Sequence, residues 1–384
     1  MSELKEKKIL LLSPSLISED PRVLAHLKVL REFGHVTTAG FGAQPDLADL
    51  HLEVDSTARW LPVDVLSLVR IALRLYKSAS RATRFNNAVR DAISERIFDL
   101  VVANDVHSLV IAKEIADYSC ASLWVDMHEY APRESEYDWR WRLLYQKYVA
   151  WICSNVLPKA HIVTTVSEGI RSQYENDSCR PVELIRNTSS FVQRQSDHVT
   201  FTDRIIRLVH VGAAIRARVL TNMIDAVKGL NGFHLDLYLV PTDQQYYKEL
   251  VAIAKKIPNI DVIAPVSLNE LVPIIANYHC GIVTIPPTNF NYQNCLPNKV
   301  FQYVQARLPI VTGPIAEISQ IVDHYGIGWV TPNFSSESIR ETLLNIRSDD
   351  LVSMSQKLDI AAAELSQENE NVKRHRFVSS LLEV

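Results

Sequence analysis

The chain has 384 residues, of which 47% are hydrophobic and 22% charged, a composition that suits about two globular domains and excludes a disordered chain. Its net charge of −4 excludes a general nucleic-acid binder, which would need an excess of basic residues. The 11 glycines form none of the common glycine-rich phosphate loops.

The N-terminal segment runs from polar residues into a short apolar stretch at 8–13. This stretch is too short for the core of a signal peptide and is predicted to be a strand. No apolar run reaches the roughly 18 residues of a membrane span. The five cysteines form no C-x-x-C pair, which predicts free thiols in a reducing compartment rather than disulfides or a zinc site. We therefore expect a cytoplasmic protein.

Short apolar runs alternate with helical stretches through the first half of the chain. This alternation is typical of a doubly wound parallel sheet whose strands are buried on both faces. The clearest helix start is Asp20-Pro21, an N-cap followed by proline at the first helical position, and Gly34 is predicted to end this helix. The predicted strands are 8–13, 35–41, 99–104, 121–126, 161–166 and 182–186.

The polar segment 187–203 has no hydrophobic period and is predicted to be a linker, after which the same pattern restarts. The predicted strands of the second half are 205–211, 234–240, 259–264, 279–285 and 308–312, with helices at about 218–230, 243–256, 268–277, 298–306 and 315–323. The tail 336–384 is predicted to be helical, with too few apolar residues for a core of its own.

We therefore predict an α/β protein with Rossmann-like domains at 1–190 and 204–350. A helical tail at 351–384 is expected to pack back over the domain junction toward the N-terminal domain. Ligands of open α/β sheets bind at the carboxyl ends of the strands. Two such domains facing each other across a cleft would hold one substrate each, an arrangement that suits group transfer.

Several segments, in this order and spacing, resemble glycosyltransferases of the GT-B fold, in particular the retaining family 4. They are 18–42, 101–112, 124–130, 164–170 and 182–187 in the first domain, and 209–227 and 296–311 in the second. The resemblance implies a nucleotide-diphosphate sugar as donor, with UDP- or GDP-linked sugars favoured, and a glycan or lipid-linked acceptor. It implies retention at the anomeric carbon, no further cofactor and no metal ion. The sequence shows no convincing metal-ligand spacing.

The first domain is expected to bind the acceptor. His128 follows a predicted strand, and an imidazole there would bind sugar hydroxyls or carry a proton. The resemblance makes His128 the catalytic group; the alternative is a histidine satisfied by neighbouring backbone. Asp126 and Glu129 are expected to orient its ring or to cap a loop or helix. By the resemblance, the acceptor side also includes Ser15, Arg22 and Asp105, although the Asn104-Asp105 pair would equally suit a turn and a helix cap.

The second domain is expected to bind the donor, because a diphosphate needs positive charge and N–H donors. Gly212 ends a predicted strand, and Arg216, Arg218 and Lys299 follow at the openings of helices. The resemblance assigns these four residues to the diphosphate, and Arg218 matches the family's basic residue best; the alternative for each cation is a solvated surface charge. Asn294, Asn298 and Gln302 are expected to contact the donor sugar and the ribose.

The donor motif departs from the family pattern at three positions. Asn294 and Gln302 stand where relatives often have glutamates, and Arg307 stands where they usually have glycine. Amides cannot supply a carboxylate to a diol, and a charged hydrogen bond is about twice as strong as a neutral one. These departures keep open a non-catalytic subunit that binds glycan or a partner enzyme. A nucleotide-sugar epimerase is less favoured because no pair of carboxylates is evident.

Two basic, aromatic segments leave a membrane role open. Residues 59–90 carry many arginines, and Leu66, Val69, Leu73 and Tyr76 are predicted to share one helical face. Residues 139–151 interleave aromatic and basic side chains. Such segments suit an anionic membrane surface, which would place the protein on the inner face of the membrane. They equally suit core helices whose arginines extend to water.

Overall fold

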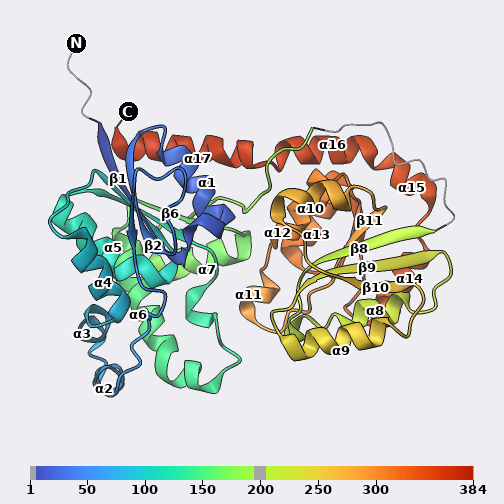
Figure 1. The fold of residues 1–384 in the computed structure, drawn as a ribbon, viewed down its shortest axis with the longest axis horizontal. Coiled ribbons are helices and arrows are strands. Elements are labelled where there is room, and N and C mark those ends of the chain that lie inside the picture. The colour runs from blue at the N-terminus through green and yellow to red at the C-terminus, as the bar shows by residue number, and fades with distance from the viewer. Residues whose placement is uncertain (1–5, 194–204, 384) are drawn as a thin grey trace, which may run out of the picture. The chain divides into compact units, whose positions relative to one another are not determined.

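The computed structural model describes residues 6–193 and 205–383. The predicted linker at 187–203 therefore lies partly outside the described residues. The chain divides into two compact units: Met1–Arg186 together with Asn371–Val384, and Asn187–Glu370. Each unit contains its own parallel sheet (Figure 1). None of the described helices combines the length and apolar character needed to cross a bilayer.

The sheet of the first unit has seven parallel strands in the order β3-β2-β1-β4-β5-β6-β7. The strands are β1 Lys7–Leu16, β2 Gly34–Phe41, β3 Leu50–Glu53, β4 Leu100–Asn104, β5 Ser122–Met127, β6 Ile162–Thr165 and β7 Glu183–Leu184. The helices are α1 Pro21–Leu30, α2 Val65–Ala72, α3 Tyr76–Arg81, α4 Arg84–Ile93, α5 Asp105–Ser119, α6 Gln146–Val156 and α7 Glu168–Ser178. Short helical turns are η1 Ile17–Glu19, η2 Ala131–Arg133, η3 Trp141–Tyr145 and η4 Leu157–Lys159.

The predicted start of the first helix is confirmed. The Asp20 carboxylate accepts hydrogen bonds from the backbone N–H groups of Arg22 and Val23, at 3.1 and 3.3 Å, and so caps α1. The predicted end of this helix is wrong, since α1 ends at Leu30 and Gly34 instead begins β2. A Cβ on Gly34 would lie 2.1 Å from the carbonyl oxygen of Lys7, so the close approach of β1 requires glycine there.

The basic segment 59–90 forms separate helices rather than one continuous face. Helix α2 ends at Ala72, and Arg74 takes a left-handed conformation with φ +58° before α3 begins. Leu66 and Val69 lie on α2, whereas Tyr76 begins α3. The prediction of one shared helical face is therefore wrong, because the turn at Arg74 redirects the chain.

The sheet of the second unit has six parallel strands in the order β10-β9-β8-β11-β12-β13. They are β8 Ile206–Ala213, β9 Phe233–Val240, β10 Ile260–Ile263, β11 Cys280–Val283, β12 Ile310–Thr312 and β13 Gly328–Val330. After the turn η5 Arg216–Arg218, the helices of this unit are α8 Thr221–Val227, α9 Gln244–Ala254, α10 Leu268–Ile275, α11 Phe290–Gln293, α12 Asn298–Gln305, α13 Ala316–Tyr325, α14 Ser336–Leu344, α15 Ser348–Ser353 and α16 Ser355–Glu364. The last helix, α17 Gln367–Leu382, belongs from Asn371 onward to the first unit.

Both faces of the second sheet are buried. Leu208 and Val209 are neighbours on β8, yet they belong to different apolar clusters, because successive side chains of a strand point to opposite faces. The α16 residues Leu358 and Ala361 belong to the same cluster as Val209. This burial on both faces explains why the central strands appear in the sequence as continuous apolar runs.

The end of the chain belongs to the core of the first unit. Phe377, Val378 and Leu381 of α17 are buried in one cluster with Leu27 of α1 and Trp124 of β5. The predicted helical character of the tail is confirmed by α14 to α17. Its last turns supply apolar surface that the N-terminal segments alone do not provide.

Candidate functional site

Three of the residues predicted to bind diphosphate come together in the second unit. Gly212 lies near the carboxyl end of β8 with φ +151°. A Cβ at Gly212 would lie 2.7 Å from Nζ of Lys299 and 3.5 Å from Nη1 of Arg218. Any larger residue at Gly212 would therefore displace Lys299. We call Gly212, Arg218 and Lys299 the cationic cluster.

The ammonium group of Lys299 is buried beside a neutral histidine. Nδ1 of His210 lies 2.9 Å from the carbonyl oxygen of Ile282 and donates to it. This leaves Nε2 of His210 as the acceptor for Nζ of Lys299, at 3.2 Å. Burial, followed by the nearby Lys299 charge, lowers the pKa of His210 well below its usual range. The imidazole therefore adds no charge to the cationic cluster near neutral pH.

The positive charge of the cationic cluster is poorly compensated. Burial lowers the pKa of Lys299 well below its usual range, and the charge of Arg218 lowers it further. Within the described ranges, neither side chain forms an ion pair with a carboxylate, and Nε of Arg218 is buried without a hydrogen-bond partner. Lys299 is also the second residue of α12, so the helix N-terminus adds positive potential. This arrangement suits an anion with several oxygens.

Arg216 does not join the cationic cluster. Its guanidinium donates two hydrogen bonds to the carboxylate of Glu249 on α9, at 2.9 and 3.0 Å. It also lies over the ring of Tyr246, with 4.7 Å from the guanidinium carbon to the ring centroid. Arg216 is exposed and engaged with α9, so it matches the surface-charge alternative.

Of the three predicted amide residues, Asn294 directly follows α11, and Asn298 and Gln302 lie on α12. Asn294 follows α11 and donates from Nδ2 to the carbonyl oxygen of Phe290 at 2.8 Å. Asn298 begins α12, and Gln302 lies four residues later on the same helix face. Asn298 is exposed and Gln302 half-buried, so both can reach a ligand placed against α12.

The contacts of Arg307 explain why an arginine stands at a position where the related glycosyltransferases usually have glycine. Its φ of +59° is the left-handed conformation that glycine adopts most easily. The guanidinium pairs with Asp359 at 2.8 Å and donates to the carbonyl oxygen of Val192 at 2.9 Å. It also stacks over the ring of Phe191 at 5.5 Å. Arg307 thus fixes residues 191–192 to the second unit, and none of these partners belongs to the cationic cluster.

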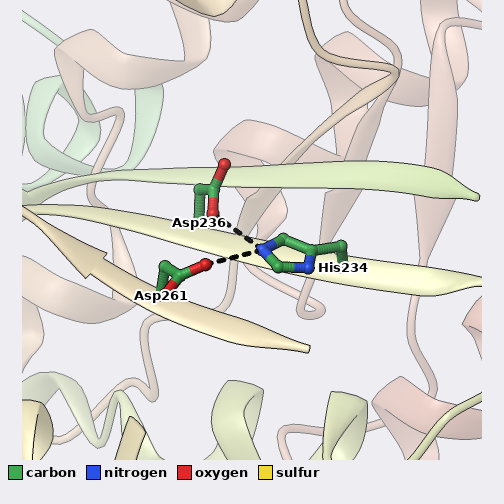
Figure 2. Close-up of side chains that lie close together, drawn as sticks. All are labelled: His234, Asp236 and Asp261. Atoms are coloured by element: carbon green, nitrogen blue, oxygen red, sulfur yellow. Dashed lines mark hydrogen bonds and ion pairs between the residues drawn. The ribbon is translucent and has the colours of Figure 1, made fainter. Parts of the chain in front are cut away.

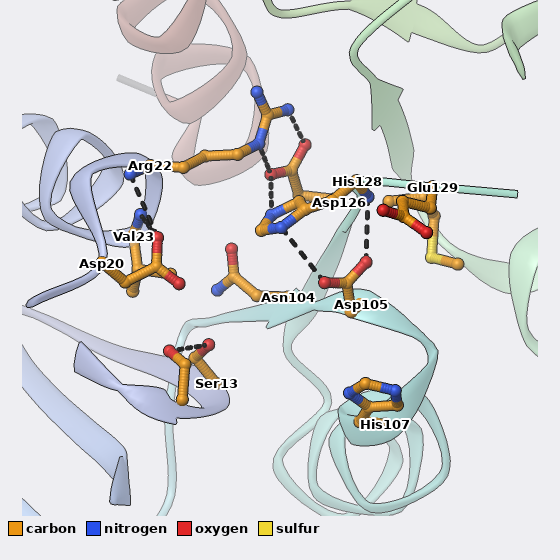
Figure 3. A network of polar contacts seen from close by, with 12 residues as sticks. Ser13, Asp20, Arg22, Val23, Asn104, Asp105, His107, Asp126, His128 and Glu129 are labelled. Atoms are coloured by element: carbon orange, nitrogen blue, oxygen red, sulfur yellow. Dashed lines mark hydrogen bonds and ion pairs between the residues drawn. The ribbon is translucent and has the colours of Figure 1, made fainter. Parts of the chain in front are cut away.

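Asp126 is the centre of a buried network in the first unit (Figure 3). Its carboxylate accepts hydrogen bonds from Nε and Nη2 of Arg22, at 2.7 and 2.6 Å, and its Oδ2 lies 2.9 Å from Nε2 of His26. Arg22 is 1% exposed and Asp126 0%. Although burial opposes its charged form, the nearby Arg22 and His26 hold the pKa of Asp126 well below its usual range. Arg22 and Asp126 were both expected on the acceptor side, but their burial makes them positioning residues.

The ring of His128 is held between two carboxylates. Nδ1 lies 3.1 Å from Asp105, and Nε2 lies 3.2 Å from Asp126 (Figure 3). The backbone N–H of His128 also donates to Asp105, at 2.9 Å. Burial opposes the charged form, but the two carboxylates outweigh it and raise the pKa of His128. The predicted orientation of the ring by Asp126 is confirmed, and the alternative of a ring satisfied by backbone is wrong.

Asp105 and His26 show what the sequence did not reveal about this network. Asp105 begins α5 with φ +58°, and this turn aims its carboxylate at His128 rather than at its own helix N-terminus. His26 was not predicted, although it follows Arg22 by four residues on α1 and so shares its helix face. Burial lowers the pKa of His26 to about 4, so it is neutral at pH 7.

Ser15 and Glu129 lie at the carboxyl ends of their strands, as predicted. The hydroxyl oxygens of Ser13 and Ser15 are 2.9 Å apart on β1. Glu129 follows β5 and is exposed. Desolvation, together with the carboxylates of Glu134 and Asp105, raises the pKa of Glu129 to about 7. With this pKa, Glu129 gains or loses a proton near neutral pH. The sequence did not indicate this property.

A separate cluster of three side chains lies toward the amino ends of β9 and β10 in the second unit. Figure 2 shows these side chains. Nε2 of His234 lies 3.1 Å from Asp236 and 3.0 Å from Asp261, from neighbouring strands β9 and β10. These three side chains have the donor types of a metal site, which the sequence spacing did not predict. Arg207 lies 3.1 Å from the other carboxylate oxygen of Asp236, and Tyr278 donates to it at 2.6 Å. Because Arg207 supplies a positive charge here, we assign the cluster as ion pairs at the sheet edge.

Comparison with known proteins identifies the fold. No protein-family model and no curated protein matches the chain. A crystal structure of HepE from Anabaena in complex with UDP and glucose has a TM-score of 0.70 at 14% identity, covering 98% of this chain and 100% of that one. Sucrose-phosphate synthase from Thermosynechococcus elongatus has a TM-score of 0.73 at 12% identity, covering 98% and 99%.

A third solved structure is also similar to this chain. The trehalose-6-phosphate protein of E. coli bound with UDP-2-fluoro glucose has a TM-score of 0.67 at 10% identity, covering 98% of this chain and 99% of that one. These likenesses, together with the two parallel sheets, establish the GT-B fold that the motifs predicted.

Proposed function

We propose that this protein is a glycosyltransferase that moves a sugar from a nucleotide-diphosphate donor to a glycan or lipid-linked acceptor. The cationic cluster carries the proposal, since it holds two uncompensated cations around a glycine at the end of a central strand. The UDP ligands of HepE and of the E. coli protein support a UDP-linked donor. Membership of family 4, retention, independence of metal ions and a role in cell-surface polysaccharide or glycoconjugate synthesis belong to the same proposal.

The chemistry follows from charge. When the bond between the anomeric carbon and the phosphate oxygen breaks, negative charge develops on the diphosphate. Lys299 and Arg218 stabilise that charge in a site where burial makes electrostatic interactions strong. We assign Asn294, Asn298 and Gln302 to the sugar and ribose, where neutral amides would bind more weakly than glutamates. A bound diphosphate favours the charged form of Lys299 and so opposes the lowering of its pKa by burial and by Arg218.

The first unit is proposed to bind the acceptor. His128 is assigned to the reacting centre, where Asp105 and Asp126 hold its ring and favour its protonated form. Glu129, whose pKa is about 7, exchanges the proton of an acceptor hydroxyl. Ser15 lies at the same edge of the sheet and is assigned to acceptor hydroxyls.

Arg218 and Arg216 give a matched pair for testing the donor site. In thermal unfolding, UDP at a hundred times its dissociation constant adds about 2.7 kcal/mol, a shift of a few degrees. We expect Arg218→Ala to abolish this shift and Arg216→Ala to keep it, because only Arg218 lies at Gly212. GDP, ADP, CMP and dTDP measured in parallel identify the preferred donor base. No shift with any nucleotide would favour the non-catalytic subunit.

His128→Ala is expected to lower turnover about a hundredfold or more. The variant removes the imidazole that Asp105 and Asp126 hold at the carboxyl end of β5. Turnover is measured as release of nucleoside diphosphate, and the UDP thermal shift serves as the control, since the cationic cluster lies in the other unit. Unchanged turnover would remove His128 from the chemistry.

A further inference from the structure

Exposed apolar side chains gather on one part of the first unit. Helix α2 and the turn η3 lie side by side, and the hydroxyl of Tyr145, the last residue of η3, donates to the carbonyl oxygen of Pro62 at 3.1 Å. We call the following exposed side chains the α2–η3 surface: Val63, Val65, Leu66, Val69, Leu73, Leu75, Tyr137, Trp139 and Leu143.

Helix α2 is not a core helix. Six of its eight residues are apolar (VLSLVRIA), yet it buries only Ser67 and Ile71. Leu66 is 60% exposed, Val69 47% and Leu73 65%. A core helix with this composition would cover these side chains, because each buried leucine or valine contributes to stability. The exposed stripe therefore indicates a surface that a partner covers.

A cationic pocket adjoins the exposed stripe. The pocket is open, has a volume of about 800 Å³ and is lined by Arg70, Arg74, Lys77, Arg81 and Trp151, among others. Arg81 pairs with Glu114, whereas Arg70, Arg74 and Lys77 form no ion pair within the described ranges. Neither α2 nor α3 contains an acidic residue. The N-cap of α2 is Asp64, and its carboxylate accepts a hydrogen bond from the backbone N–H of Ser67.

Arg74 occupies a conformation that favours glycine. Its φ is +58°, and the backbone N–H of Leu75 closes the turn by donating to the carbonyl oxygen of Arg70 at 2.7 Å. A side chain at such a position destabilises the turn relative to glycine. The arginine instead places a cation in the pocket, beside Arg70 and Lys77.

We propose that the α2–η3 surface docks on an anionic lipid bilayer, with its apolar side chains in the interface and a lipid phosphate in the cationic pocket. Exposed leucine, valine, tryptophan and tyrosine next to arginine and lysine are the composition of interfacial segments. A second copy of the same face would bring like charges together, which disfavours self-association. The inference deepens the proposed function by naming the surface at which a lipid-linked acceptor reaches the first unit.

Vesicle co-sedimentation tests the proposal. The full chain is mixed at low salt with vesicles of phosphatidylglycerol and phosphatidylcholine, and separately with pure phosphatidylcholine. We expect binding only to the anionic vesicles, weakened by added salt, because each basic side chain near the surface contributes roughly fivefold in affinity. Absence of binding to anionic vesicles at low salt, or equal binding to both kinds, overturns the proposal.

Two kinds of variant separate docking from folding. Arg74→Gly removes a pocket cation at a position where glycine suits the backbone, so we expect unchanged or slightly raised thermal stability and roughly fivefold weaker vesicle binding. Leu66→Glu with Val69→Glu changes side chains that are already exposed and is expected to weaken binding more than tenfold. The matched control is Leu344→Glu, an exposed leucine of α14 in the second unit.

The outcomes show whether the α2–η3 surface binds lipid or another partner, and whether a variant affects this surface or the donor site. Loss of binding in the α2 variants with the UDP thermal shift unchanged supports the proposal. Equal loss in Leu344→Glu contradicts a specific surface. A dimer in size-exclusion chromatography that Leu66→Glu dissociates would make the surface a protein interface and overturn the membrane assignment. Displacement by free inorganic phosphate as effective as by anionic lipid would also overturn it.

Discussion

Asp126→Asn is expected to destabilise the protein by about 3–5 kcal/mol, because it leaves Arg22 as a buried charge without a counter-charge. The same substitution weakens the hydrogen bonds to His26 and His128. Chemical denaturation at pH 7 measures the effect. The matched control is Asp91→Asn on the exposed side of α4, for which we expect less than about 0.5 kcal/mol.

A double variant sharpens this test. Arg22→Met combined with Asp126→Asn should be less destabilising than the sum of the single changes, since no unpaired charge remains. Additive effects would contradict the network in Figure 3. The contribution of His26 to stability should also fall as the pH falls from about 6.5 to 4, because His26 takes up a proton in the unfolded chain while its folded pKa is about 4. The raised pKa of His128 acts in the opposite direction. The Asp126 contribution is lost at lower pH still, as the pH falls below the carboxyl's unfolded pKa and through its lowered folded value.

Lys299→Met is expected to raise the dissociation constant of UDP by about 10- to 100-fold, the range of a lost charge-assisted hydrogen bond. Methionine has a similar length but no charge, so the change removes one of the two cations at Gly212. Isothermal titration calorimetry measures the affinity. The matched control is Lys255→Met, an exposed lysine just after α9, which should leave the affinity unchanged.

Stability should respond to Lys299→Met in a different direction from binding. The free protein buries this ammonium next to Arg218, so its removal is expected to leave thermal stability unchanged or raised, despite the hydrogen bond lost to His210. Because the folded pKa of Lys299 is lowered, the wild type should gain stability relative to the variant as the pH rises toward 10.5. A variant that is both less stable and unchanged in UDP affinity would contradict the donor-site assignment.

Local patterns determined much of the fold. The central strands are apolar runs because both faces of each sheet are buried, and this requirement is visible residue by residue along the chain. The strands that were missed, β3 at Leu50–Glu53 and β13 at Gly328–Val330, lie at sheet edges and are partly exposed. Their residues therefore carry no continuous apolar signal. The predicted helix at 218–230 starts only at Thr221, because Val219 adopts a left-handed conformation with φ +46°.

For the candidate site, too, the sequence predicted some features and only the structure showed the others. The motifs brought Gly212, Arg218 and Lys299 to notice, and the structure places them together. The sequence favoured Arg218 over Arg216 only by resemblance, and the structure adds the physical reason: Glu249 on α9 draws Arg216 away. Arg307 was interpreted as an obstacle in the donor motif, whereas its partners lie on α16 and at residues 191–192.

The sequence by itself determined two parallel-sheet domains, and it drew attention to the strand ends and to the basic residues of the proposed donor site. Those features follow from periodicity and turn chemistry within single elements. Only the tertiary structure decided that Asp126 joins Arg22, His26 and His128, residues up to about a hundred positions apart. It also decided that α2 keeps its leucines exposed. Burial and pairing depend on which elements pack against each other, and no local window of sequence contains that information.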